Sequence, residues 1–205
     1  MSNLDLLKKL IKIESISPND NGCFDVIKQQ FEGLDFSFEE TSYKNISNLV
    51  ITNGNSKNKT FCFLGHTDVV PPGPESEWTV PPFSGEIIDN KIYGRGAADM
   101  KGGVACFISA LKEFLSEYRD PSFNIMILLN SNEEGKLENG KVDRVINEMI
   151  DKDKFIDFCL IGEPSSSKKV GDVIRIGRRG SLSGNLKVYG IQGHVAYPKQ
   201  ALNPI

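Results

Sequence analysis

Apolar positions recur along the chain with helical spacing in some stretches and form short continuous runs in others. Leu4, Leu7, Leu10 and Ile11 have the i, i+3, i+4 spacing of an amphipathic helix. The predicted helices cover residues 3–14, 23–33, 104–118 and 141–152. The predicted strands cover 48–52, 61–70, 124–129 and 155–161, and the first two are expected to pair side by side.

This order of elements indicates the fold class. Strands that alternate with helices are typical of an α/β fold, in which helices cover both faces of a mostly parallel sheet. A hairpin is predicted where apolar residues alternate around Asp89-Asn90. From Val173 the pattern changes to two alternating strands, which suit an antiparallel hairpin in a different unit. We therefore predict a domain boundary near Gly177.

Composition narrows the classes of function. The 205 residues are 39% hydrophobic, which is enough for a core, and their net charge of -3 leaves no basic surplus for a nucleic acid. No apolar run reaches the roughly 18 residues that span a membrane, and residues 1–15 lack a signal-peptide core, so we expect a cytoplasmic protein. The four cysteines have no CxxC spacing, and we expect reduced core residues at Cys23, Cys62, Cys106 and Cys159.

Side chains that can bind a metal follow the ends of the predicted strands. In FLGHTDVV, His66 and Asp68 are two residues apart, so they lie on one side of a strand and the carboxylate can accept the imidazole N–H. Sheets of this class place their sites at the carboxyl ends of the strands. The residues expected at that edge are His66, Asp99, Glu133, Glu134 and Glu163.

Each of these residues also has an ordinary interpretation. A lone strand-end histidine usually bonds to a neighbouring aspartate, Asp99 could cap a helix, and single glutamates are usually solvated. Several carboxylates at one edge would repel one another without a cation, so a metal site explains the cluster best. Histidine and carboxylates without cysteine favour zinc, with cobalt or manganese as possible substitutes. A spare acid would be the general base.

Five motifs, in this order and spacing, resemble one family. They are GHTDVVPPG, YGRGAADMKGG, NEEG, GEPS and GRRGSL followed by GHVAYP. They are similar to the di-zinc deacylase and peptidase family that includes acetylornithine deacetylase, carboxypeptidase G and succinyl-diaminopimelate desuccinylase. Within it, AADMKGG, IGRRGSL and GHVAYPKQALNPI are most like the desuccinylases. The resemblance covers nearly the whole chain.

The resemblance implies a role for each site residue. His66 and Glu163 would bind one zinc ion, Glu134 the other, and Asp99 would bridge the two, with cobalt a possible substitute. Glu133 would be the catalytic base, Asp68 would orient the histidine ligand, and a non-proline cis peptide would follow Asp99. His194 would reach the site of a partner subunit in a homodimer and stabilise the reacting oxygen. Substrate carboxylates would be bound by Arg178, Ser181 and Tyr197.

The two expected domains follow the same resemblance. Residues 1–177 would be an incomplete di-metal catalytic domain, and 178–205 the beginning of a lid or dimerisation domain. Without the resemblance, His194 would be interpreted as an exposed loop histidine and Arg178-Arg179 as a surface pair. Family members are longer and supply one more histidine, so the second zinc lacks a ligand here. We expect these residues to be the front half of an enzyme that is weakly active or inactive alone.

The implied reaction is the zinc-dependent hydrolysis of N-succinyl-L,L-2,6-diaminopimelate to succinate and L,L-diaminopimelate, a step towards lysine and cell-wall synthesis. One alternative is an acetylornithine deacetylase or another N-acyl amino acid deacylase or peptidase of the same family. Another is a truncated fragment that binds metal without catalysis. A dinucleotide-binding protein is disfavoured, because the Gly94-Arg-Gly96 stretch does not continue into a complete G-x-G-x-x-G motif between a strand and a helix.

Overall fold

The computed structural model describes residues 2–54, 59–135, 142–152, 154–177, 180, 182 and 184–204. These residues form two compact units, Met1–Pro164 and Ser165–Ile205, which are described separately. The predicted domain boundary near Gly177 stays a prediction.

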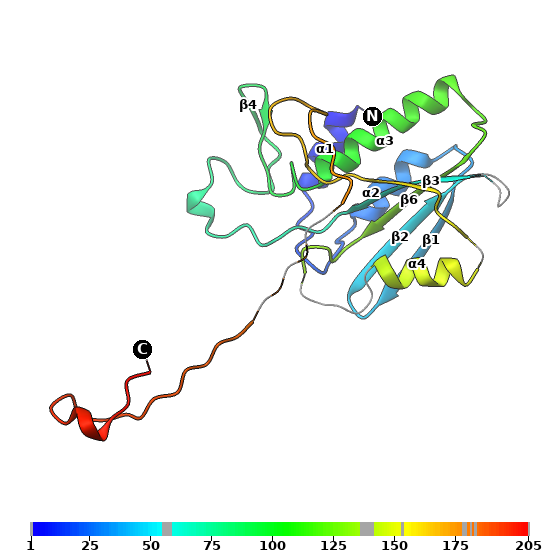
Figure 1. Ribbon diagram of the computed structural model, residues 1–205. Helices are drawn as coiled ribbons and strands as arrows, with labels where there is room; N and C mark the ends of the chain where they lie inside the picture. The colour runs from blue at the N-terminus through cyan, green and yellow to red at the C-terminus, as the bar shows by residue number, and fades with distance from the viewer. Residues whose placement is uncertain are drawn as a thin grey trace. The chain divides into compact units, whose positions relative to one another are not determined.

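A mixed sheet forms the centre of the Met1–Pro164 unit (Figure 1). The sheet described has five strands in the order β1-β2-β6-β3-β7. Strands β3, β6 and β7 are parallel, β2 is antiparallel to β6, and β1 is antiparallel to β2, so only β2 opposes the others. The strand bounds are β1 Ser37–Tyr43, β2 Ile46–Thr52, β3 Thr60–His66, β6 Asn124–Asn130 and β7 Phe158–Ile161.

The strand order corrects one prediction. Strands β2 and β3 are not neighbours, because β6 lies between them and pairs with both. Every residue of β6 is buried, as its continuous apolar sequence requires of a central strand. The edge strand β1 was not predicted, because its polar residues are largely exposed and lack an apolar face.

Helices cover both faces of this sheet, which confirms the predicted fold class (Figure 1). Helices α1, α2 and α3 share one apolar cluster with Leu49, Phe63 and Ile127. Helix α4 packs on the opposite face, where Val145 and Met149 join a second cluster. The bounds are α1 Asn3–Ile11, α2 Cys23–Lys28, α3 Lys101–Glu117 and α4 Val142–Ile150. Among the described residues, no helix has the length and apolar character needed to cross a bilayer.

The predicted hairpin is present as β4, Ile87–Ile88, and β5, Lys91–Ile92, which pair antiparallel. The two residues between them, Asp89 and Asn90, have φ values of 49° and 60°. Positive φ at both positions is the geometry of a type I′ turn, which aspartate and asparagine tolerate better than most residues. The chain then enters the glycine-rich stretch before α3.

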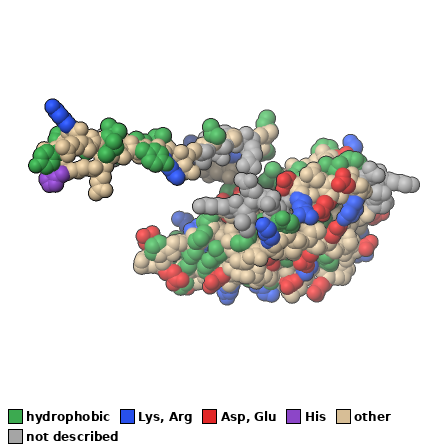
Figure 2. Space-filling view, turned by 90° about the horizontal axis from the view of Figure 1, so that it is seen from below, with side chains coloured by type: hydrophobic (Ala, Val, Ile, Leu, Met, Phe, Trp, Pro, Cys, Tyr) green, Lys and Arg blue, Asp and Glu red, His purple; other side chains and the backbone are tan. Residues whose placement is uncertain are grey.

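The Ser165–Ile205 unit differs from its prediction. Its described residues form no strand pair, and only an isolated bridge joins Ile191 to Leu202. Ile174 and Ile176 are 81% and 102% exposed, so the alternating pattern has no core to face. A lone hairpin without such packing is marginal in water. Hydrophobic side chains accordingly lie at the surface of this segment (Figure 2).

The cysteines are free, as predicted, but only Cys23 and Cys62 are buried. Cys106 and Cys159 are exposed, so the expectation of a core position is wrong for these two. Cys106 lies on α3, and Cys159 lies in β7, whose four residues are all exposed. An apolar sequence run therefore does not guarantee burial at the edge of a sheet.

A buried lysine joins α3 to the end of α1. The Lys101 ammonium donates to the carbonyl oxygens of Leu10 and Ile13, both at 2.8 Å, and its side chain is fully buried. Burial lowers the pKa of Lys101. These two carbonyls lie at the end of α1 and just after it, where carbonyl oxygens have no donor within the helix and need one from elsewhere.

We expect Lys101→Met to lower the free energy of unfolding by about 2 kcal/mol, because it leaves two carbonyls without this donor in a buried site. The measurement is urea unfolding followed by circular dichroism. Lys112→Met, on a partly exposed position of the same helix, is the matched control and should change stability by less than about 0.5 kcal/mol. Equal effects of the two substitutions would contradict this role.

Candidate metal centre

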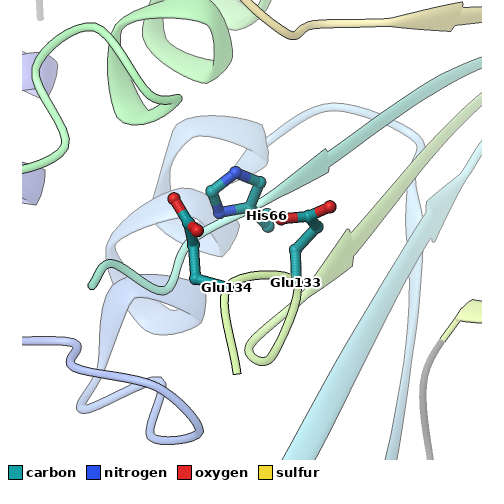
Figure 3. A group of neighbouring side chains, drawn as sticks. All are labelled: His66, Glu133 and Glu134. Carbon is teal, nitrogen blue, oxygen red and sulfur yellow. The ribbon is translucent and has the colours of Figure 1, made fainter. Parts of the chain in front are cut away.

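The candidate residues gather where β3, β6 and β7 end. His66 is the last residue of β3, Glu133 and Glu134 follow β6, and Glu163 follows β7. The parallel register places His66 opposite Asn130, so the ends of β3 and β6 lie at the same edge. Figure 3 shows the Glu133 and Glu134 carboxylates on either side of the His66 ring.

The two nitrogens of the His66 ring face different partners. Nδ1 lies 2.9 Å from the Asp68 carbonyl oxygen and 3.4 Å from its carboxylate Oδ1. The closer acceptor is therefore the Asp68 backbone carbonyl, and the carboxylate expected to accept the imidazole N–H lies farther away. Nε2 lies 3.1 Å from Asp99 Oδ1 and 3.5 Å from Glu163 Oε1. When Nδ1 carries the proton, the Nε2 lone pair points towards two acids.

The side chains form two overlapping groups with the spacing of metal ligands. One consists of His66, Asp99 and Glu163, and the other of His66, Glu133 and Glu134. Within each group the candidate ligand atoms lie within 4.8 Å of one another. His66 is 1% exposed, whereas Asp99 and Glu163 are 50% and 40% exposed. One nitrogen and several carboxylate oxygens are a donor set that fits zinc or a similar divalent ion.

The acidic side chains of the centre lie close together, and burial and this proximity raise the pKa values of two of them, Glu163 and Glu134. Burial raises the pKa of Glu163 to about 7, and the nearby Asp99 and Glu133 charges act in the same direction. Burial and the Asp99 charge likewise raise the pKa of Glu134. Burial by itself would lower the pKa of His66, but its contacts with Asp68 and the charge of Glu163 raise that pKa to about 9. Raised pKa values of this kind favour the protonated acids, and a bound divalent cation would favour their charged forms instead.

Glycines bring the elements of the centre close together. A Cβ atom at Gly103 would lie 2.5 Å from the Gly162 carbonyl oxygen, so the start of α3 can approach the end of β7 only without a side chain there. This approach brings the segment of Asp99 near Glu163. The predicted cis peptide between Asp99 and Met100 is present.

Asp68 holds the turn that carries both glutamates. It is fully buried, and its Oδ1 accepts the Glu133 N–H while its Oδ2 accepts the Glu134 N–H, each at 3.1 Å. The Ser17 hydroxyl donates to the same Oδ2. Burial raises the pKa of Asp68, but the His66 and Ser17 hydrogen bonds and the His66 charge outweigh it and hold that pKa below its usual value.

The sequence identified Asp68 as a site residue. It did not predict the hydrogen bonds of Asp68 to the backbone of Glu133 and Glu134, or its hydrogen bond from Ser17. Ser17 lies 51 residues from Asp68 in a polar loop, and no local pattern links the two. His194 and Tyr197 lie in the Ser165–Ile205 unit, with ring centroids 5.8 Å apart. Their predicted roles stay predictions. Arg178 and Ser181 lie outside the described residues.

A match to a family model defines the class of protein. Residues 62–201 match the model of peptidase family M20/M25/M40, and the chain belongs to this family. The resemblance inferred from the motifs is thereby confirmed.

Particular relatives narrow the similarity further. The chain is 48% identical to succinyl-diaminopimelate desuccinylase of Psychromonas ingrahamii and 46% identical to that of Methylococcus capsulatus. Each alignment covers 98% of this chain and 53% of the relative, so the chain spans about half the length of the curated relatives it matches.

Solved structures agree with the fold. Human carnosine dipeptidase 1 matches with a TM-score of 0.69 and 24% identity, over 80% of this chain and 38% of its own. An M20 family metallo-carboxypeptidase from Sulfolobus solfataricus matches with a TM-score of 0.67 and 25% identity, also over 80% and 38%. These likenesses support the mixed sheet with helices on both faces.

Proposed function

We propose that this chain carries the metal centre of an amidohydrolase that cleaves N-succinyl-L,L-2,6-diaminopimelate to succinate and L,L-diaminopimelate. The observation that carries the proposal is the placement of His66 Nε2, 3.1 Å from Asp99 and 3.5 Å from Glu163. The choice of substrate rests on the 45–48% identity to proteins named succinyl-diaminopimelate desuccinylase.

The residues of this chain would supply three ligands to one zinc ion and two to a second. His66 and Glu163 would hold one ion, Asp99 would bridge, and Glu134 would belong to the other. The raised pKa of Glu134, caused by burial and by the Asp99 charge, fits two acids that share a cation. Bound zinc would supply Lewis-acid chemistry, polarising the amide carbonyl and making water more acidic. Cobalt would be a substitute with the same ligand preference.

Glu133 is the proposed general base. Its backbone is fixed by Asp68, and its carboxylate stands within 4.8 Å of a His66 ring nitrogen and a Glu134 oxygen. There it would take a proton from the water that attacks the amide carbonyl carbon, and return it to the departing amine nitrogen. The attack forms the new carbon–oxygen bond, and the carbon–nitrogen bond then breaks as the nitrogen receives that proton, so succinate and a free amine leave.

The remaining assignments depend on the family resemblance. His194 would stabilise the negative oxygen of the reacting amide from a partner subunit, and Arg178, Ser181 and Tyr197 would bind substrate carboxylates. The homodimer and the cytoplasmic location likewise stay predictions.

The test compares two substrates under the same conditions. The longest polypeptide that the gene encodes is purified, loaded with Zn²⁺ and assayed for kcat/KM with N-succinyl-L,L-diaminopimelate and with N-acetylornithine. We expect the succinylated substrate to be preferred, and removal of zinc by a chelator to abolish turnover. Preference for N-acetylornithine would refute the desuccinylase proposal in favour of a related deacylase. The 205-residue chain alone should be weakly active or inactive.

A further inference from the structure

The loop between α1 and α2 is attached to the ends of the strands that carry the metal centre. The Ser17 N–H donates to the Val69 carbonyl at 3.1 Å, and the Val69 N–H donates to the Ser15 carbonyl at 2.9 Å. The Ser15 hydroxyl donates to the Thr67 carbonyl at 2.7 Å. The loop thus lies alongside residues 67–69, and Ile16 forms an isolated parallel bridge with Val69.

The same loop is also joined to the end of β6. The Ser131 hydroxyl donates to the Pro18 carbonyl at 2.7 Å and accepts the Ser47 N–H at 2.9 Å. The Thr67 hydroxyl donates to Asp20 Oδ1 at 3.0 Å. Attachments to β3 and β6 together leave the loop little freedom, so the Ser17 side chain has a defined position.

The Ser17 hydroxyl is connected to the metal centre by a single intermediate residue, Asp68. It donates to Asp68 Oδ2, the oxygen that also accepts the Glu134 N–H. The other oxygen of Asp68 accepts the Glu133 N–H at 3.1 Å and lies 3.4 Å from His66 Nδ1. A buried carboxylate with donors on both oxygens cannot rotate without losing several of them.

We infer that Ser17 is a positioning residue of the metal centre. Its hydroxyl fixes the Asp68 carboxylate, and that carboxylate fixes the turn that carries Glu133 and Glu134. The inference rests on the proposed function in so far as that turn supplies a base and a metal ligand. It adds a residue from a loop that contains no ligand and no base.

The first test measures the turn directly and needs no metal. Amide hydrogen exchange of Glu133 and Glu134 is followed by NMR in the metal-free chain and in Ser17→Ala. We expect exchange at both amides to be about 10-fold faster in the variant, since their acceptor can turn away. Ser15→Ala is the matched control: it removes a buried hydroxyl from the same loop, but one that bonds to Thr67 instead of Asp68. Equal exchange at both amides in the two variants would overturn the inference.

The second test measures metal affinity. Co²⁺ binding is titrated by its visible absorption in the unmodified chain, Ser17→Ala and Ser15→Ala. We expect about 10-fold weaker binding in Ser17→Ala only, the size of effect usual for residues that support metal ligands. Binding as tight in Ser17→Ala as in Ser15→Ala would contradict the positioning role. Absence of Co²⁺ binding by the unmodified chain would instead overturn the proposed metal centre, and this inference with it.

Discussion

Glu133→Gln is expected to lower kcat by about 1000-fold, because the glutamine side chain cannot take a proton from water. General base catalysis typically accelerates a reaction by about 10²-fold to 10⁴-fold. The substitution keeps the size and shape of the side chain and the backbone N–H that donates to Asp68. Metal content should therefore be unchanged. The measurement is steady-state turnover of the N-succinyl substrate by the longest polypeptide that the gene encodes, with zinc per chain determined on the same sample.

Two comparisons make this result specific. Glu134→Gln alters the neighbouring residue of the same turn, and here we expect zinc to be lost together with activity. Glu117→Gln, at the exposed end of α3, should leave both unchanged. If Glu133→Gln retained nearly full activity, or lost its zinc as Glu134→Gln does, Glu133 would not be the base.

Asp99→Asn is expected to lower zinc affinity, a different effect with a different cause. Asp99 Oδ1 lies 3.1 Å from His66 Nε2, and the proposed function makes Asp99 the ligand that two ions would share. Asparagine keeps one oxygen but no charge, so zinc affinity should fall by at least about 100-fold, more than is usual for a residue that only supports a ligand. Activity at limiting zinc should fall with it. Zinc competition against a coloured chelator measures the affinity.

The matched control is Asp120→Asn, an exposed aspartate in the loop after α3. It removes the same charge from the surface and should leave zinc affinity unchanged. Recovery of Asp99→Asn activity at high zinc would agree with a loss of affinity alone. Zinc affinity that is unaltered in Asp99→Asn would exclude Asp99 as a ligand.

The sequence was most informative where a pattern reports a local requirement. The apolar run of β6 predicted a fully buried strand, and Asp89-Asn90 predicted the hairpin turn, because each depends on adjacent residues. The sequence also predicted that His66 and Glu163 lie at the same edge of the sheet, because the carboxyl ends of parallel strands meet at one edge. Their proximity is thus a consequence of element order.

Other features depend on contacts that adjacent residues do not encode. Strands that follow one another in sequence usually pair, yet β2 pairs with β6 and not with β3. Nothing in the local sequence of β2 or β3 indicates this arrangement. Gly102 and Gly103 are poor helix formers and suggested a later start for α3. Close backbone contacts explain the two glycines, because a Cβ atom at Gly103 would meet the Gly162 carbonyl oxygen and one at Gly102 the Ala97 carbonyl oxygen. The contact of Ser17 with Asp68 became visible only once the fold joined them.

A metal centre built on His66 can be tested by Co²⁺ titration of the 205-residue chain, followed by visible absorption and compared with His66→Ala. We expect saturable binding of about one ion per chain, with the absorption bands of a low-symmetry nitrogen and oxygen site, and loss of those bands in His66→Ala. No saturable binding, or identical bands in His66→Ala, would contradict a metal centre built on His66, Asp99 and Glu163.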